Sequence, residues 1–126
     1  MSIKTPLATA KGLGSAKDGV HHWLVQRLTA LALIPLVFCF VKAVLQVALS
    51  KDEAKFTSLF TSPFYTITMI LFITVGLYHG SLGMRVVIED YVHCKCGKTA
   101  LIILTNFISI LSALVAVLAI LKVHLT

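Results

Sequence analysis

Hydrophobic residues gather in three long stretches of the chain, and charged residues lie almost entirely between them. Residues 57–84 and 99–121 contain no Asp, Glu, Lys or Arg, and the only charge in residues 28–49 is Lys42. Each stretch reaches the roughly 20 residues that a helix needs to cross a hydrocarbon core of about 30 Å. Helices can span lipid because each one satisfies its own backbone hydrogen bonds. The pattern therefore predicts an all-α integral membrane protein with three transmembrane helices.

Polar residues and turn signals place the expected ends of these helices. We expect one membrane domain, residues 1–126, with an N-terminal arm at 1–22, spanning helices at 23–49, 63–88 and 100–122, and connections at 50–60 and 89–98. Pro35 should kink the first helix, because proline removes a backbone hydrogen bond. Thr61-Ser62-Pro63 predicts the start of the second helix, as a hydroxyl cap followed by proline in the first turn.

Composition agrees with lipid as the main solvent. Of the 126 residues, 58% are hydrophobic and 13% are charged, whereas about a quarter of a soluble domain is charged. The net charge of +6 fits an anionic lipid surface, so nucleic acid is not an expected partner.

The positive charges predict the orientation in the membrane. Lys and Arg are in excess before the first helix and around the connection 89–98, whereas Asp52 and Glu53 balance the lysines of the connection 50–60. Because such an excess marks the cytoplasmic or matrix side, we expect the N-terminus there. Residues 1–20 are too polar for a secretory signal and lack Arg, which argues against a mitochondrial presequence. We therefore expect a bacterial inner membrane rather than a mitochondrial one.

The three cysteines do not form a disulfide framework. Cys39 lies within the first helix, where a small apolar side chain fills space. His93, Cys94 and Cys96 form a compact His-Cys-Lys-Cys cluster, but it lacks a fourth ligand and the C-x-x-C spacing of zinc sites. We do not expect a metal ion there.

His79 is the most informative single residue. It lies about nine residues, or roughly 13 Å, from the inner end of the second helix. An ionisable group at such depth is costly and faces the bundle interior or a cofactor. Gly76, Gly80 and Gly83 surround it on neighbouring helix faces and would leave room for another helix or for a flat macrocycle. A neutral imidazole in an apolar pocket is typical of an axial haem ligand; the alternative is a histidine bonded across the bundle, with the glycines serving packing alone.

A haem at His79 would also require a partner. None of the other histidines lies at a matching depth; they are His21, His22, His93 and His124. Ligation by two histidines would therefore need one from another subunit.

Three further residues near the inner membrane surface carry candidate chemistry. At about 100° per residue, Asp90 lies nearly above His79, and Tyr91 is turned about a third of the circle away. A tyrosine hydroxyl there can donate a hydrogen bond to a quinone carbonyl, and a neighbouring carboxylate can orient it or pass protons. The alternative is an interfacial tyrosine beside a solvated acid. Arg27 could pair with Asp90, with haem propionates or with lipid phosphate.

Together these residues resemble the small membrane-anchor subunit of succinate dehydrogenase, respiratory complex II, of cytochrome b type. Residues 19–30 read Gly-Val-His-His-Trp-Leu-Val-Gln-Arg-Leu-Thr-Ala, which is similar to the family's Gly-Val-His followed by an Arg-x-Thr-Ala helix start. His79, the Gly-Met pair at 83–84 and the Asp-Tyr-Val-His run at 90–93 are similar to its haem-ligand and quinone-site pattern. The resemblance covers nearly the whole chain and departs from the family at Cys94-Lys95-Cys96.

The resemblance implies a haem b and a ubiquinone site. His79 would be an axial ligand, and the other would come from a second membrane-anchor subunit. Tyr91 would hydrogen-bond ubiquinone, Asp90 would support that site, and Arg27 would lie near it and the haem propionates. His21 matches a family position whose contact is either a propionate or the surface.

It also implies soluble partners. An iron–sulfur subunit and a flavoprotein subunit would dock on the inner face and pass electrons from succinate, linking the tricarboxylic acid cycle to the respiratory chain. The chain has no dinucleotide fingerprint and no cysteine set for iron–sulfur clusters. It is therefore expected to be an accessory subunit rather than the catalytic one.

Two alternatives stay open at this point. One is the membrane anchor of a fumarate reductase, which runs the same chemistry in reverse. The other is a small scaffold or transport protein without cofactors, in which His79 and Tyr91 would tolerate substitution.

Overall fold

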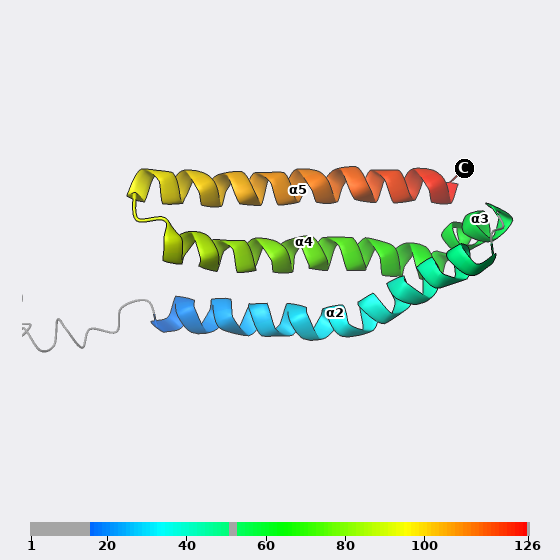
Figure 1. The fold of residues 1–126 in the computed structure, drawn as a ribbon, viewed down its shortest axis with the longest axis horizontal. Helices are drawn as coiled ribbons and strands as arrows, with labels where there is room; N and C mark the ends of the chain where they lie inside the picture. The colour runs from blue at the N-terminus through cyan, green and yellow to red at the C-terminus, as the bar shows by residue number, and fades with distance from the viewer. Residues whose placement is uncertain (1–15, 51–52, 126) are drawn as a thin grey trace, which may run out of the picture.

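A computed structural model describes residues 16–50 and 53–125, and the regular structure in these ranges is helical throughout. The helices follow one another as α2 (Ala16–Ser50), α3 (Glu53–Thr61), α4 (Pro63–Tyr91) and α5 (Lys95–Leu125). The long helices lie side by side with α4 in the middle, and the short α3 lies across one end (Figure 1).

Three helices have the length and apolar character needed to cross a membrane. They are Gly19–Ser50 within α2, Pro63–Tyr91 and Lys95–Leu125. The prediction of an all-α chain with three transmembrane helices is confirmed, and the chain is a multi-pass membrane protein.

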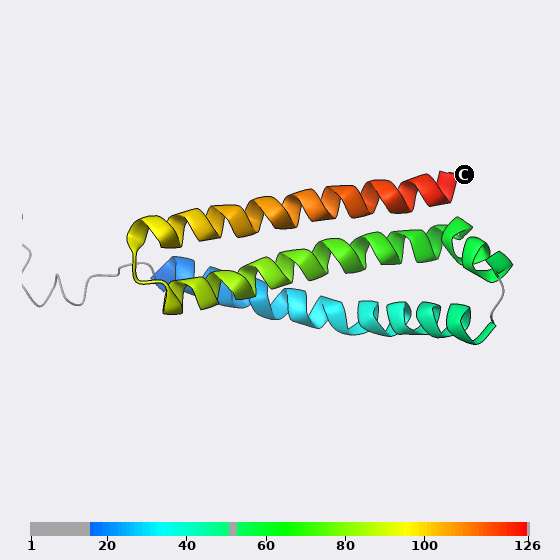
Figure 2. The same cartoon turned by 45° about the horizontal axis from the view of Figure 1, so that its top comes forward.

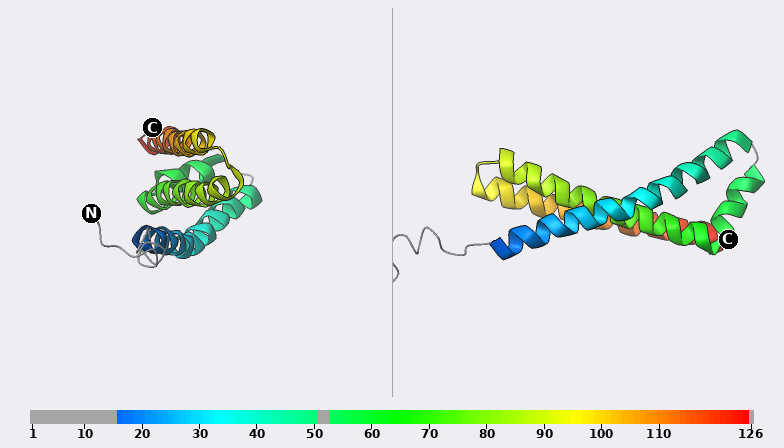
Figure 3. Two further views of the ribbon diagram at one scale, coloured as in Figure 1. Left: turned by 90° about the vertical axis from the view of Figure 1, so that its left-hand side faces the viewer. Right: turned by 90° about the horizontal axis from the view of Figure 1, so that it is seen from below.

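The three long helices form an open layer. α4 contacts both α2 and α5, whereas α2 and α5 make no contact with each other within the described residues. Seen end-on, the helices stand in a row rather than in a closed triangle (Figure 3). Few side chains are therefore buried, and the hydrophobic core cluster is small, formed by Ala43, Met69 and Ile120.

The two ends of the layer differ. The start of α2 and the α4–α5 connection lie together at one end, here named the loop end (Figure 2). α3 and the end of α5 lie at the opposite end, here named the α3 end. The topology thus places the start of α2 and the second connection on one side, which agrees with the arrangement that the positive charges predicted.

Every spanning helix is longer than predicted. α2 begins at Ala16, so residues 16–22, assigned to an arm, are helical; the rest of the predicted arm, 1–15, lies outside the described residues. α4 continues to Tyr91, and α5 begins at Lys95, so the predicted connection 89–98 shrinks to residues 92–94. Hydrophobicity locates the part of a helix inside the hydrocarbon, whereas the backbone hydrogen bonds continue into the polar interface.

The first connection is also partly helical, which corrects the predicted loop at 50–60. α3 contacts α2, α4 and α5, with Leu59 half-buried beside Phe40 and Met69. Its hydroxyl groups bond back to its own backbone, as Ser58 Oγ does to the Lys55 carbonyl oxygen at 3.0 Å. A segment this short shows too little periodicity to separate a helix from a polar loop.

α4 begins where the sequence predicted, with Pro63 in the first turn after an extended Ser62. The hydroxyl cap is wrong, because the Ser62 side chain makes no capping hydrogen bond. The Thr61 hydroxyl instead donates back into α3, 3.1 Å from the Thr57 carbonyl oxygen. The Ser62 carbonyl oxygen accepts from the backbone N–H of Thr66 at 3.1 Å and from its hydroxyl at 3.1 Å.

α2 changes direction in its second half, which carries it away from α4 toward α3 (Figures 1 and 3). Pro35 lies inside this helix and cannot donate to the carbonyl one turn earlier, which is the usual cause of such a bend. Before the helices diverge, Phe40 of α2 stacks on Phe72 of α4, with ring centroids 4.6 Å apart.

Candidate functional site

His79 is half-buried on the side of α4 that faces α2. Its Nδ1 atom lies 2.9 Å from the hydroxyl oxygen of Thr29. The same hydroxyl lies 2.9 Å from the Val25 carbonyl oxygen and 3.0 Å from the Gln26 carbonyl oxygen. The structure thus anchors one imidazole nitrogen of His79 to α2, and no hydrogen bond to its Nε2 is found among the described residues.

The glycines around His79 have two different environments. A Cβ at position 76 would lie 3.9 Å from Leu33 Cδ2, and one at position 83 would lie 3.5 Å from Gln26 Nε2. Both glycines therefore belong to the contact between α4 and α2. A Cβ at position 80 would meet nothing within 4 Å. Gly76 and Gly83 thus lie in the helix contact at ordinary van der Waals distance from α2, and Gly80, the residue after His79, faces open space.

Two buried polar atoms of α2 have no hydrogen-bond partner within the part of the chain that the structure describes. They are His22 Nε2 and Gln26 Oε1. His22, Gln26 and Thr29 follow one another at spacings of four and three, which places them on one face of α2. In lipid, a buried polar atom needs a partner from water, ligand or protein. This polar stripe leads along α2 to the level of His79.

An open cleft of about 610 Å³ lies beside the stripe, between the first turns of α2 and the last turns of α4. Its polar side chains are His21, His22, Tyr78, Arg85 and Glu89. The cleft therefore offers a polar surface near the loop end of an otherwise apolar layer.

Sequence reasoning missed Thr29 and Gln26. A threonine or glutamine inside a hydrophobic run carries little weight by itself. The signal that could have found them is the helical spacing of positions 22, 26 and 29, since three polar residues on one face of a spanning helix need a reason.

Asp90 and Tyr91 are exposed at the loop end of α4. Tyr91 is the last residue of the helix, and 79% of its surface is exposed. Asp90 lies eleven positions beyond His79, or about 16 Å along the axis. These two of the three predicted quinone-site residues are therefore free to meet a ligand or a partner, well away from His79.

Arg27 lies apart from Asp90. Because Thr29 contacts His79, Arg27 is only about 3 Å nearer the loop end than that contact, at nearly the depth of His79. Two positions apart, Arg27 and Thr29 point to nearly opposite sides of α2. The Arg27 guanidinium carbon lies 5.7 Å from the Trp23 ring centroid, and no ion pair joins Arg27 to Asp90 in the described ranges.

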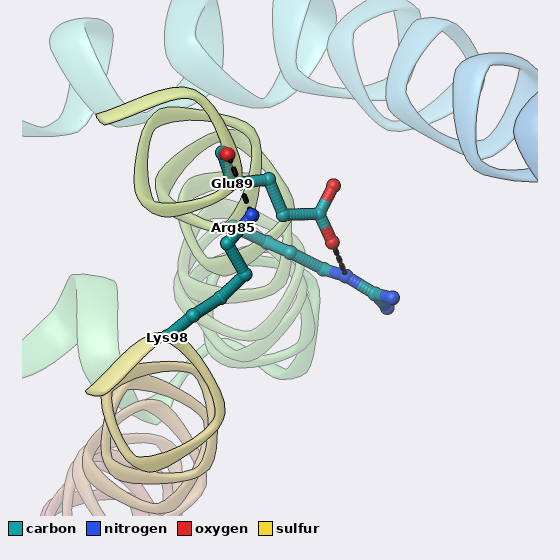
Figure 4. A network of polar contacts seen from close by, with 3 residues as sticks. All are labelled: Arg85, Glu89 and Lys98. Atoms are coloured by element: carbon teal, nitrogen blue, oxygen red, sulfur yellow. Dashed lines mark hydrogen bonds and ion pairs between the residues drawn. The ribbon is translucent and has the colours of Figure 1, made fainter. Parts of the chain in front are cut away.

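The α4–α5 connection is held by a polar network around Glu89 (Figure 4). Arg85 Nε donates to Glu89 Oε1 at 2.9 Å, one helical turn apart. Lys98 Nζ, from α5, donates to the Glu89 carbonyl oxygen at 2.8 Å. The exposed ion pair contributes little by itself, but Lys98 satisfies one of the last carbonyls of α4 and ties the two helices together.

The cysteines are free thiols. Cys39 is half-buried in α2, and Cys94 and Cys96 are exposed at the connection. Within residues 16–50 and 53–125, no group of three or more His, Cys, Asp or Glu side chains is arranged to hold a metal ion.

Comparison with known proteins identifies the family. The sequence model of the family named succinate dehydrogenase/fumarate reductase transmembrane subunit matches residues 1–121. The chain belongs to this family. Relatives named succinate dehydrogenase hydrophobic membrane anchor subunit are similar to this chain over most of its length. The Rickettsia typhi protein is 34% identical over 118 residues, or 94% of each chain.

Two further relatives have the same name. The Rickettsia bellii protein is 35% identical over 120 residues, again 94% of each chain. The Paracoccus denitrificans protein is 33% identical over 102 residues, or 81% of this chain and 78% of that one. The family resemblance predicted from residues 19–30 and from the segment after His79 is confirmed.

Proposed function

We propose that this transmembrane subunit anchors a succinate dehydrogenase in the bacterial inner membrane, binds a b-type haem through His79 and forms part of the ubiquinone-reduction site. The observation that carries the haem assignment is the hydrogen bond between His79 Nδ1 and Thr29. Histidines that ligate metals commonly bond through their other ring nitrogen to a nearby oxygen, which orients the ring.

The surroundings of His79 fit a haem. A b-type haem would supply a one-electron redox centre within the membrane. His79 presents Nε2, for which the described residues provide no hydrogen-bond partner, and Gly80 beside it leaves open space. Arg27 lies at nearly the same depth, where a cation in a spanning helix needs an anionic partner. The Arg27 side chain leaves α2 nearly opposite Thr29, so it would meet a haem propionate only at a haem edge that extends past α2. His21, which lines the polar cleft, is the other candidate for that contact.

The second axial ligand would come from a partner. His124, the histidine of α5, is hydrogen-bonded to Thr66 at the α3 end, far from His79. The open layer leaves both of its faces for other helices (Figure 3). A second membrane-anchor subunit would complete the bundle, and the iron–sulfur and flavoprotein subunits would dock on the loop end, which we place on the cytoplasmic side.

Tyr91 and Asp90 would serve ubiquinone at that same end. The exposed Tyr91 hydroxyl can donate to a quinone carbonyl, and Asp90 beside it can orient the ligand or supply a proton. Relatives named as succinate dehydrogenase anchors favour succinate oxidation over the fumarate reductase alternative. A preference of the purified complex for a low-potential menaquinone would favour that alternative instead.

The test is to compare His79→Ala with His124→Ala in the complex purified from membranes. Both histidines bond a threonine across the helix layer, so each variant loses a similar contact. We expect His79→Ala to lose most of the haem per complex while still inserting and assembling, and His124→Ala to keep it. A normal haem content in His79→Ala would overturn the assignment.

A further inference from the structure

We propose that Thr29 is a positioning residue that fixes the tautomer and orientation of His79, so that Nε2 is the nitrogen left to bind iron. The proposal rests on the proposed function of His79 as a haem ligand. It concerns a residue of a different helix, which reaches His79 only because α2 and α4 pack in this register.

The Thr29 hydroxyl has a single hydrogen, and its neighbours determine where that hydrogen points. A threonine hydroxyl has one hydrogen to donate and two lone pairs to accept. Its oxygen lies 2.9 Å from the Val25 carbonyl oxygen, one turn earlier in α2. Other helical hydroxyls of this chain bond to carbonyls in the same way, including those of Thr68, Thr74, Ser81 and Thr105. The hydrogen of Thr29 therefore goes to its own backbone, and a lone pair faces His79.

The lone pair of Thr29 determines the tautomer of His79. A neutral imidazole has one N–H. Because Nδ1 lies 2.9 Å from the accepting oxygen of Thr29, Nδ1 is the nitrogen that holds the hydrogen. Nε2 then has the free lone pair that a metal ligand requires. The reverse tautomer would place an N–H on Nε2, and the described part of the chain offers no acceptor for it. That tautomer would therefore leave an unpaired donor in an apolar layer, which is costly.

The contact with Thr29 also fixes the orientation of the His79 ring. The Thr29 oxygen is close to both the Val25 and Gln26 carbonyls, which restricts the side chain to one rotamer. The imidazole ring is thus held from a fixed point on the neighbouring helix. Donation from Nδ1–H also makes the ring a more basic ligand, which stabilises oxidised iron over reduced iron.

The chain contains a matched control for this arrangement. At the α3 end the Thr66 hydroxyl donates to the Ser62 carbonyl oxygen at 3.1 Å and lies 3.1 Å from His124 Nδ1. This second threonine–histidine pair joins α4 to α5 and lies about 20 Å along α4 from His79. Thr66→Val therefore removes the same type of contact without touching the proposed haem site.

The experiment compares Thr29→Val, Thr29→Ser and Thr66→Val in the complex purified from membranes, by haem affinity and by the haem midpoint potential. We expect Thr29→Val to weaken haem binding by about 10- to 100-fold and to raise the midpoint potential. Thr29→Ser, which keeps the hydroxyl, should restore both values, and Thr66→Val should leave both unchanged. If Thr29→Val does not assemble, Thr29→Ala is measured in its place.

The outcomes separate this inference from the function on which it rests. A complex that contains haem and loses it in His79→Ala, but has the same affinity and potential in Thr29→Val, would overturn the positioning role alone. Wild-type complex without haem would overturn the proposed haem ligation by His79, and the Thr29 inference with it.

Discussion

Two residues of α4 show how environment separates their roles. His79 is half-buried and bonded to a neighbouring helix, as an ionisable side chain deep in a span requires. Tyr91 is 79% exposed at the end of the same helix, where an aromatic ring with a hydroxyl suits the membrane interface. The first environment favours a buried cofactor, and the second favours a ligand that exchanges with the membrane.

Tyr91→Phe tests the proposed quinone contact. We expect it to slow succinate-dependent reduction of a ubiquinone analogue by about two- to tenfold, because it removes one hydrogen bond worth roughly 0.5–1.5 kcal/mol. Succinate oxidation with an artificial soluble acceptor should be unaffected. Tyr65→Phe is the matched control, since the Tyr65 hydroxyl lies at the opposite end, 3.3 Å from Gln46 Oε1. Equal loss of both activities in Tyr91→Phe would indicate faulty assembly instead.

His79, Asp90 and Tyr91 could be singled out from sequence because their chemistry is unusual for their depth or position. The spacing of positions 22, 26 and 29 could have marked Thr29 as part of a polar stripe, but its contact with His79 could not be predicted, because a threonine in an apolar helix usually bonds only its own backbone. Its role depends on the register of α2 against α4, which no local pattern specifies. The same register separates Arg27 from Asp90. Hydrophobicity alone locates only the ends of the helices, so it left a pairing of these two residues open.

At the level of helices, two glycines of α4 lie in its contact with α2. Gly83 admits the Gln26 side chain, and Gly76 admits Leu33. Close approach of this kind drives helix association in lipid, where no hydrophobic effect acts between helices. A side chain much larger than alanine at either position would press on α2, which holds Thr29 against His79.

Gly83→Leu tests this contact against Gly80→Leu. We expect Gly83→Leu to destabilise the detergent-solubilised chain by about 1–3 kcal/mol, because it overfills a packed contact. Gly80→Leu should cause no loss, since a Cβ there meets nothing within 4 Å. Unfolding followed by circular dichroism measures both. Equal destabilisation by the two variants would refute the assigned packing face.

The helices themselves could be predicted because three apolar stretches of this length, with Lys42 as their only charge, have few alternatives in lipid. Their ends could not, since residues 89–91 and 95–98 are polar and yet helical. α3 was missed for a related reason: its stability comes from contacts with three other helices, and a segment of this length is marginal alone.

At the scale of the molecule, residues 16–50 and 53–125 form one layer with both faces exposed. Large apolar side chains such as Phe38, Phe107 and Leu118 lie open on it, which suits lipid or further helices. A site that needs a second axial ligand cannot be completed inside such a layer. The open architecture and the single deep histidine thus support the same account, in which the anchor works only within a complex.

Haem ligation by His79 can be examined with a reduced-minus-oxidised visible spectrum of the complex purified through a tag on this chain. We predict a b-type haem band in preparations that also contain flavoprotein and iron–sulfur subunits. A preparation with the full set of partner subunits but without a haem band would contradict the ligand role of His79.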